Sequence, residues 1–254
     1  MKIAVVSGAS SGMGREFAKE LDKRERFDEI WVIARRRERL EELAKELRSK
    51  VRVLPLDLTN GDSVKEYEEL LKSESPEVAV LINASGYGKF GAFCDMPLDE
   101  QLGMVDLNVK SLVAMTYATL PFMKEGGRVF QIDSLSAFQP VPYIGVYGAT
   151  KAFVLSFTRA VNAEIRSRGI RMMAVCPGWV KTEFFDRAVT DDSVITYYNR
   201  FYTPDQVVKR AFHDMDKHRD VSICGAAVRN QVFLTKLLPH RLVMKIWLRQ
   251  QKKN

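Results

Sequence analysis

Residues 1–16, MKIAVVSGASSGMGRE, place a short apolar run directly before a glycine-rich loop. The run IAVVS predicts a first strand, and the residues after the loop begin a helical pattern. Such a loop lets the backbone approach a pyrophosphate, and the N-terminus of the next helix faces its negative charge. Hydroxyls at Ser10 and Ser11 can donate to the same ligand. The alternative, a simple tight turn, is less favoured because a strand and a helix flank the loop. The spacing GxxxGxG is formed by Gly8, Gly12 and Gly14.

Short runs rich in valine and isoleucine recur along the chain and alternate with longer amphipathic patterns such as residues 36–50 and 99–123. Most are apolar on both faces, as buried parallel strands are. This alternation predicts an α/β fold with a doubly wound parallel sheet, in a single domain spanning residues 1–254. The strand candidates are IAVVS, EIWVIA, VRVLPL, VAVLINA, RVFQID, IRMMAVC and DVSIC.

The composition, 46 % hydrophobic and 28 % charged over 254 residues, is typical of a globular protein. No run reaches the roughly 20 apolar residues that span a bilayer. The N-terminal apolar run is too short for a secretory signal, so we expect a cytoplasmic location. Cys94, Cys176 and Cys224 lie far apart without a CxxC pair, which predicts neither a disulfide framework nor a zinc site, and hence no metal.

The net charge of +7 is concentrated at the C-terminus, because residues 240–254 contain five basic and no acidic residues. The body is therefore close to neutral, which argues against a nucleic-acid partner. Residues 232–254 are predicted to be a basic amphipathic extension, with Arg241, Lys245, Arg249 and Lys252 on one side of a helix. This helix could cover the substrate pocket, form a subunit contact or rest on an anionic membrane; a packing helix is favoured over the membrane.

Residues 134–151, SLSAFQPVPYIGVYGATK, carry groups suited to acid–base chemistry. Tyr147 and Lys151 are four residues apart in a helical pattern, so their side chains project from one face. Free tyrosine titrates near pH ~10, and a neighbouring ammonium should lower the pKa of the phenol. Ser134 follows a strand-like run and can hydrogen-bond an oxygen held against that phenol. Alone, a Tyr and a Lys at this spacing are a common chance arrangement.

The ends of the second and third predicted strands indicate the cofactor. An NAD-binding protein usually places an acid about 20 residues past the glycines, but Arg35 stands there instead. A guanidinium suits a 2′-phosphate, so NADP(H) is favoured over NAD(H). We assign Arg36, Arg37 and Arg39 to a charged surface helix. Asp57 can reach an adenine amino group or cap the next helix.

Two asparagines and one aromatic segment have open alternatives. Asn83 ends the fourth strand, where it can meet a ligand or brace a turn. Asn108 interrupts an apolar helical stripe, where it can satisfy backbone groups or break one ladder bond and hold a water. After the sixth strand, Val180 and Thr182 can meet the carboxamide end of the cofactor. Residues 183–203 are crowded with aromatic residues and are predicted to form a substrate lid, or equally a helix pair that packs on the core.

Together these features resemble the short-chain dehydrogenase/reductase family. The motifs run in order over most of the chain, and the set is more specific than any one of them. Three positions depart from the family pattern: Ser7 replaces the usual Thr, Ser85 is inserted in the fourth-strand motif, and Asp133 stands where a second Ser is frequent. The residues that carry the match are SGASSGMG at 7–14, Asn83-Ala84-Ser85-Gly86, Asn108, Ser134, Tyr147 with Lys151, and Pro177-Gly178 with Thr182.

The resemblance implies a Rossmann fold whose seven parallel strands have the order 3-2-1-4-5-6-7. It also implies that Tyr147 is the general acid for carbonyl reduction and the general base for alcohol oxidation. Lys151 would lower the pKa of Tyr147 and hold the nicotinamide ribose, Ser134 would orient the substrate oxygen, and Asn108 would anchor a water of the proton relay. The predicted cofactor-binding residues are Ser7, Gly8, Ser10, Ser11, Gly12, Met13, Gly14, Arg35, Asp57, Leu58, Asn83, Ala84, Ser85, Tyr147, Lys151, Pro177, Gly178, Val180 and Thr182.

We therefore expect an enzyme that transfers a hydride between NADP(H) and a carbonyl or secondary alcohol. Tyr143, Trp179 and the aromatic segment favour an apolar substrate such as a steroid-like ketone or an acyl chain. The alternatives are a membrane-associated lipid-modifying reductase and a dinucleotide-sensing protein without turnover. The helices of residues 99–123 and 147–168 often form subunit contacts in the family, so a homo-dimer or tetramer is expected.

Overall fold

A computed structural model describes residues 1–189 and 194–253. Its main sheet has seven parallel strands in the order β3-β2-β1-β4-β5-β6-β9, which confirms the predicted fold and strand order. The last strand is numbered β9 because β7 (Trp179–Val180) and β8 (Phe201–Tyr202) form a separate two-stranded sheet. The other strands are β1 (Lys2–Ser7), β2 (Glu29–Ile33), β3 (Val51–Leu54), β4 (Glu77–Asn83), β5 (Arg128–Ile132), β6 (Arg171–Val175) and β9 (Val221–Ser222).

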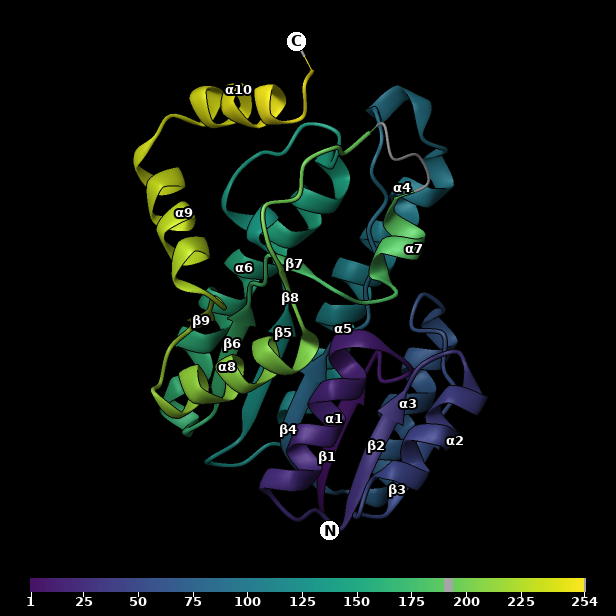
Figure 1. Ribbon diagram of the computed structural model, residues 1–254. Helices are drawn as coiled ribbons and strands as arrows, with labels where there is room; N and C mark the ends of the chain where they lie inside the picture. Colours follow the sequence, from purple (N-terminus) through teal and green to yellow (C-terminus); the bar gives the residue numbers. More distant parts are fainter. Residues whose placement is uncertain (190–193, 254) are drawn as a thin grey trace.

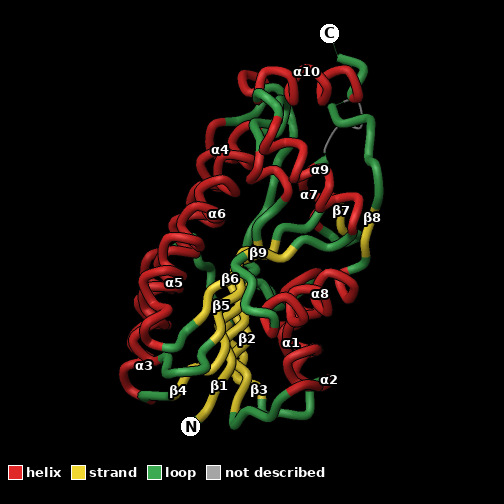
Figure 2. The backbone as a smooth tube through the Cα atoms, turned by 90° about the vertical axis from the view of Figure 1, so that its left-hand side faces the viewer, coloured by secondary structure: helices red, strands yellow, loops and turns green. Residues whose placement is uncertain are grey.

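Helices cover both faces of the sheet, as Figure 2 shows. Along β1, Ala4 and Val6 face the core under α1 and α8, while Ile3 and Val5 face the core under α3 and α5. Alternate residues of a strand point to opposite faces, so a sheet buried on both sides needs apolar residues throughout. The α-helices are α1 (Gly12–Arg24), α2 (Arg37–Glu46), α3 (Gly61–Glu74), α4 (Leu98–Val105), α5 (Ser111–Thr119), α6 (Gly145–Ile165), α7 (Phe184–Ala188), α8 (Pro204–Asp216), α9 (Ala226–Leu237) and α10 (His240–Gln250).

The helical pattern predicted over residues 99–123 is not one uniform helix. A π-helical turn, η2 (Asp106–Lys110), separates α4 from α5, and Asn108 lies within it. A π-turn changes the backbone hydrogen-bond ladder, which was one of the two alternatives given for Asn108. Short 3₁₀ turns complete the chain: η1 (Phe93–Asp95), η3 (Leu120–Phe122), η4 (Leu135–Phe138) and η5 (Arg166–Arg168).

The C-terminal extension begins earlier than residue 232. It consists of α9, which starts at Ala226, and α10, and Pro239 is the N-cap residue of α10. Figure 1 shows α9 rising from the sheet edge and α10 lying across the top of the molecule. No helix in the described part of the chain is long and apolar enough to cross a membrane.

The aromatic segment predicted over residues 183–203 contains α7 and β8, and β8 pairs with β7. Residues 190–193 of this segment lie outside the described residues. The described portion follows the end of β6 and therefore lies above the carboxyl edge of the sheet. In an open α/β sheet, ligands bind at this edge, where β1 and β4 diverge.

Candidate active site

A cleft of about 970 Å³ lies at the carboxyl edge of the sheet and brings together segments from the whole chain. The glycine-rich loop and the ends of β2 and β3 line one half. The start of α6, the segment after β6 and the helices α9 and α10 line the other half. The predicted residues that line it are Gly8, Ser10, Ser11, Gly12, Met13, Gly14, Arg35, Asp57, Leu58, Ala84, Ser85, Ser134, Tyr147, Lys151, Pro177, Gly178, Val180 and Thr182.

The glycine-rich loop forms a cradle that side chains would fill. Gly8 has φ +69°, and a Cβ there would lie 2.6 Å from the carbonyl carbon of Ala84. A Cβ on Gly14 would collide with the carbonyl oxygen of Gly8. The loop leads into the N-terminus of α1, whose unpaired amide groups favour an anion. The cradle and the helix terminus therefore fit the pyrophosphate of a dinucleotide.

Arg36, which the sequence analysis assigned to the protein surface, joins this cradle. Its guanidinium donates to Ser10 Oγ at 3.1 Å and to Ser11 Oγ at 3.0 Å, and it pairs with Glu183 at 3.1 Å. Arg35 also lines the cleft, but its side chain is 62 % exposed and lies 3.9 Å from Asp57. Two guanidinium groups, rather than the one predicted, therefore stand at the end of β2.

Asp57 is free to face the cleft because another residue caps the next helix. Asn60 is the N-cap of α3, and its side chain accepts from the Asp62 amide at 2.9 Å. Asp57 Oδ1 instead accepts from the amide and the hydroxyl of Thr59. The predicted alternative, in which Asp57 caps this helix, is therefore wrong.

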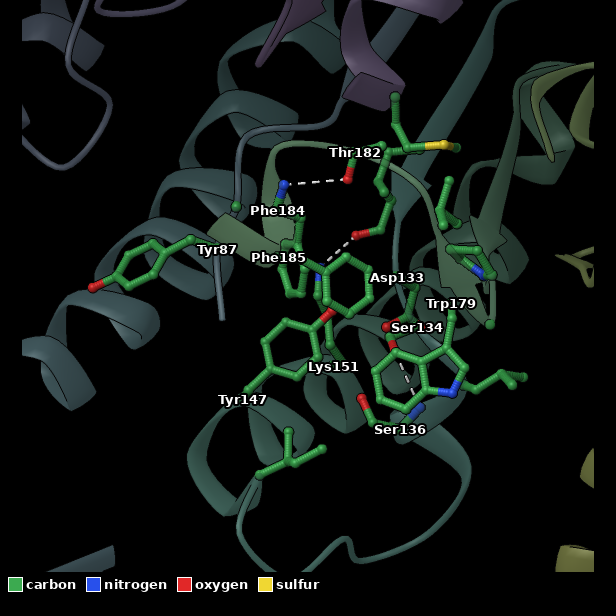
Figure 3. Close-up of a pocket in the computed structure, with 18 of the residues that line it drawn as sticks. Tyr87, Asp133, Ser134, Ser136, Tyr147, Lys151, Trp179, Thr182, Phe184 and Phe185 are labelled. Carbon is green, nitrogen blue, oxygen red and sulfur yellow. Dashed lines mark hydrogen bonds between the residues drawn. The ribbon is translucent and has the colours of Figure 1, made fainter. Parts of the chain in front are cut away.

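Tyr147, Lys151 and Ser134 converge in the cleft, as Figure 3 shows. Tyr147 and Lys151 lie in the first turns of α6, and both side chains are buried. Lys151 Nζ donates to Ile132 O at 2.7 Å and lies 5.7 Å from the centre of the Tyr147 ring. Ser134 Oγ accepts from the Ser136 amide at 3.2 Å, which fixes the serine at the start of η4.

The expectation that Lys151 lowers the pKa of Tyr147 is wrong for this structure. Burial raises the pKa of Tyr147, and only a hydrogen bond with Ser134 opposes this effect. Burial also lowers the pKa of Lys151, while the nearby carboxylate of Asp133 acts in the opposite direction. Desolvation is the largest cause acting on the pKa of each group, so burial favours the neutral, proton-donating form of the phenol.

Ser7 and Asn83 do not line the cleft; they brace the ends of β1 and β4. Ser7 Oγ accepts from the amides of Ala84 and Ser85 at 3.2 and 3.3 Å. Asn83 Nδ2 donates to Thr116 Oγ1 of α5 at 3.1 Å and to Gln131 Oε1 of β5 at 3.0 Å. Of the two alternatives for Asn83, the brace is the one found, and Ser7 has a similar role.

Asn108 likewise lies behind the cleft rather than in its wall. Its amide oxygen accepts from the Tyr87 amide at 3.0 Å, and its Nδ2 donates to Tyr87 O at 2.9 Å and to Thr150 Oγ1 at 3.1 Å. It therefore clamps the loop after β4 to α6, next to the turn that carries Tyr147. Asn108 acts on the site by positioning its wall.

The wall beside Tyr147 is aromatic. The ring of Phe184 lies 5.6 Å from that of Tyr147, and the ring of Phe90 lies 6.1 Å from it. Trp179 packs 4.9 Å from Tyr198 and 6.3 Å from Phe90. Tyr143, which was expected to contact substrate, does not line the cleft; Lys253 Nζ lies 4.7 Å from its ring centre.

Sequence reasoning missed several lining residues. Arg36 resembled its charged neighbours, and only its contacts with the glycine-rich loop distinguish it. Leu234, Ile246 and Trp247 come from the C-terminal helices, whose place over the cleft depends on tertiary packing. The basic helical pattern had indicated pocket covering as one alternative, and these residues show that α10 does contribute to the wall.

The sheet order, the glycine cradle and the serine, tyrosine and lysine that converge in the cleft define a class: Rossmann-fold oxidoreductases that act with a nicotinamide dinucleotide. Residues 2–193 match the family model described as short chain dehydrogenase, and the chain belongs to that family.

Proteins similar to this chain include one curated relative and two solved structures. An uncharacterised oxidoreductase of Staphylococcus aureus strain MW2 is 32 % identical over 184 residues, 71 % of this chain and 79 % of the relative. A short-chain dehydrogenase from Sphingobium yanoikuyae, solved with NADPH, is 27 % identical with a TM-score of 0.80 and covers 96 % of both chains. A dehydrogenase/reductase from Burkholderia phymatum, solved with NAD, shares the fold at 20 % identity, with a TM-score of 0.79 and coverage of 92 % of both chains.

Proposed function

We propose that this protein reduces bulky apolar ketones with NADPH and oxidises the corresponding secondary alcohols in the reverse direction. The observation that carries the proposal is the convergence of Tyr147, Lys151 and Ser134 on one cleft that also contains the glycine cradle. The three groups come from the start of α6 and the end of β5, next to the edge where the dinucleotide fits.

The residues of the chain account for the proton in this reaction. When bound, the reduced nicotinamide supplies a hydride to the carbonyl carbon. Tyr147 donates its phenolic proton to the carbonyl oxygen, and the neutral form that burial favours is the form required. Ser134 holds that oxygen by a hydrogen bond from its hydroxyl. Lys151 lines the same cleft and would hold the nicotinamide ribose of the bound cofactor.

The preference for NADP(H) rests on the two guanidinium groups at the end of β2. Arg35 and Arg36 both line the cleft, and Arg36 reaches the hydroxyls of the glycine-rich loop. A guanidinium pairs well with a phosphate because its donors match the spacing of the oxygens. The relative solved with NADPH is consistent with this preference.

The apolar substrate is inferred from the other half of the cleft. Phe90, Phe184 and Trp179 stand beside Tyr147, and Leu234 and Val243 extend the apolar lining toward the C-terminal helices. A ligand buried there exchanges water for aromatic and aliphatic surface, which contributes about 25 cal/mol for each Å² buried. A large hydrophobic ketone gains most from this exchange.

Replacement of Tyr147 by phenylalanine tests the proposal. The variant should lose at least about 100-fold in kcat with NADPH and a bulky ketone, because general acid catalysis contributes on that order. NADPH binding, measured by fluorescence titration, should persist. Tyr143→Phe is the matched control, since Tyr143 lies outside the cleft and should retain activity. Full turnover by Tyr147→Phe would refute Tyr147 as the general acid, whereas NADPH binding without turnover by wild type would support a dinucleotide-sensing role.

We also propose that the protein forms a homo-dimer or tetramer in the cytoplasm. Tyr117 of α5 is 78 % exposed, and Phe153 and Phe157 of α6 stack at 5.9 Å with Phe153 exposed. Exposed aromatic side chains on neighbouring helices favour a subunit contact. The three cysteines are free, which suits a reducing compartment. Light scattering in solution measures the subunit number.

A further inference from the structure

The helices α9 and α10 present apolar and basic side chains on one exposed surface. Five large apolar side chains there are more than two-fifths exposed, and four basic side chains of the α10 segment are exposed beside them. Figure 1 shows α10 at the top edge of the molecule, away from the main sheet. We define the C-terminal surface by these residues: Phe233, Leu234, Leu237, Leu242, Ile246, Arg241, Lys245, Arg249 and Lys252.

The exposure of α10 is a property of its docked position. Its inner side is fixed to the body because Trp247 Nε1 donates to Pro142 O at 3.1 Å and Val243 is buried. Gln251, just beyond the helix, accepts from the Thr196 amide at 2.8 Å. Leu242 and Ile246 are one helical turn apart and project to the other side, with Arg249 next to them. The helix is therefore anchored and still leaves apolar side chains in solvent.

The net charge of the whole chain equals the net charge of its C-terminal region. Residues 221–254 contain seven basic and no acidic residues, which equals the net charge of +7, so residues 1–220 are neutral. Within the described residues, none of the four cations of the C-terminal surface forms an ion pair, whereas exposed cations elsewhere, such as Lys65 and Lys72 on α3, have acidic partners. These cations are free to attract an anionic partner.

The cleft opens at this surface. Leu234 and Ile246 are exposed and also line the cleft, and Trp247 and Val243 continue the apolar wall inward. An apolar molecule that rests against the C-terminal surface would therefore meet apolar side chains that line the same cleft as Tyr147. A partner bound to this surface would therefore lie next to the opening of the cleft.

We propose that the C-terminal surface docks on an anionic lipid bilayer and that apolar substrate passes from the bilayer into the cleft between Leu234 and Ile246. Apolar side chains beside unpaired cations suit the boundary between acyl chains and anionic headgroups. A second copy of the chain would present the same positive charge and repel the first. The basic, apolar character of one anchored surface favours a lipid partner over a self-contact.

Vesicle co-sedimentation of the full-length protein tests the docking. Wild type should sediment with vesicles of equal phosphatidylcholine and phosphatidylserine but not with phosphatidylcholine alone, and high salt should release it. Lys245→Gln with Arg249→Gln should weaken binding roughly 25-fold, since each cation near the surface contributes about fivefold. Phe233→Ser with Leu237→Ser should weaken it as well, because these side chains reach the acyl boundary; neither lines the cleft.

The matched control is Lys65→Gln with Lys72→Gln, which removes the same charge from α3. Equal binding by this control and by wild type, with loss in the α10 variant, supports the proposal. Equal loss in both charge variants overturns it, as does the absence of wild-type sedimentation. If light scattering shows that the Phe233/Leu237 variant loses subunits rather than lipid affinity, the surface is a subunit contact and the proposal is wrong.

The substrate route rests on the proposed function and has its own readout. Reduction of a long-chain ketone carried in anionic vesicles should be several-fold faster for wild type than for Lys245→Gln with Arg249→Gln. A small water-soluble ketone should be reduced equally by both. Equal rates with the long-chain ketone overturn the route. Absence of turnover with every ketone refutes the proposed function and leaves the co-sedimentation result unaffected.

Discussion

Replacement of Asp133 by asparagine should remove a pH-dependent cost of folding. Asp133 is 3 % exposed; its Oδ2 accepts from Cys176 Sγ at 3.4 Å, and its Oδ1 has no partner within the described residues. Burial raises the pKa of Asp133 to about 7, although the charge of Lys151 and the Cys176 hydrogen bond oppose it. Glu29 is a buried carboxyl group with the opposite net shift. Burial raises its pKa as well, but hydrogen bonds from Lys50, Arg52 and Trp31 lower the pKa to about 2.

The sign and size of the effect follow from these values. Between the unfolded pKa of 3.8 and the folded pKa of about 7, the folded protein retains a proton that the unfolded chain has released. The free energy of unfolding therefore falls as the pH rises through this window and levels off above it. One pKa unit corresponds to about 1.4 kcal/mol, so the loss between about pH 5 and about pH 8 is roughly 2–3 kcal/mol.

Urea unfolding followed by tryptophan fluorescence, with Trp31 buried in the core, measures this loss. Between about pH 5 and about pH 8, the free energy of unfolding of wild type should fall by about 2 kcal/mol or more relative to that of Asp133→Asn, because the amide does not titrate. Cys176→Ala is the control that keeps the carboxyl group and removes its thiol donor, so it should retain the loss. Parallel pH curves for wild type and Asp133→Asn would show that the buried carboxyl does not have this raised pKa.

Three further changes test the dinucleotide and substrate halves of the cleft. Arg35→Asp with Arg36→Ala should shift the ratio of kcat/KM for NADPH to that for NADH by roughly tenfold or more toward NADH, and an unchanged ratio would count against a 2′-phosphate site. Gly14→Ala should weaken NADPH binding in a fluorescence titration because its methyl group collides with the loop, whereas Gly61→Ala, which meets nothing within 4 Å, should bind normally. Trp179→Ala should raise KM for a bulky ketone by about tenfold and for a small ketone by much less, and an equal change for both would contradict an apolar wall.

The fold and the centre of the site could be predicted from the sequence because both depend on short-range patterns. Each of the seven apolar runs became a strand of the main sheet, since runs apolar on both faces have few other stable placements. The glycine spacing defines a cradle through local backbone conformation, as at Gly8. Tyr147 and Lys151 share a helical face through their spacing, so their meeting required no knowledge of distant segments.

The remaining features depended on which distant segments meet. The sequence could not distinguish Arg36 from its neighbours, because its role comes from contacts with Ser10 and Ser11 about 25 residues away. It could not show that Asn83 faces away from the cleft, since this depends on Thr116 and Gln131.

The pKa of Tyr147 and the exposure of the C-terminal surface were likewise decided only by the tertiary structure. Burial is the largest cause of the raised pKa of Tyr147, and it is set by the loops and helices that close over α6. The amphipathic pattern of residues 240–250 predicted a helix. Only its docking through Val243 and Trp247 determined which side chains remain exposed, because burial depends on long-range packing and helix formation on local spacing.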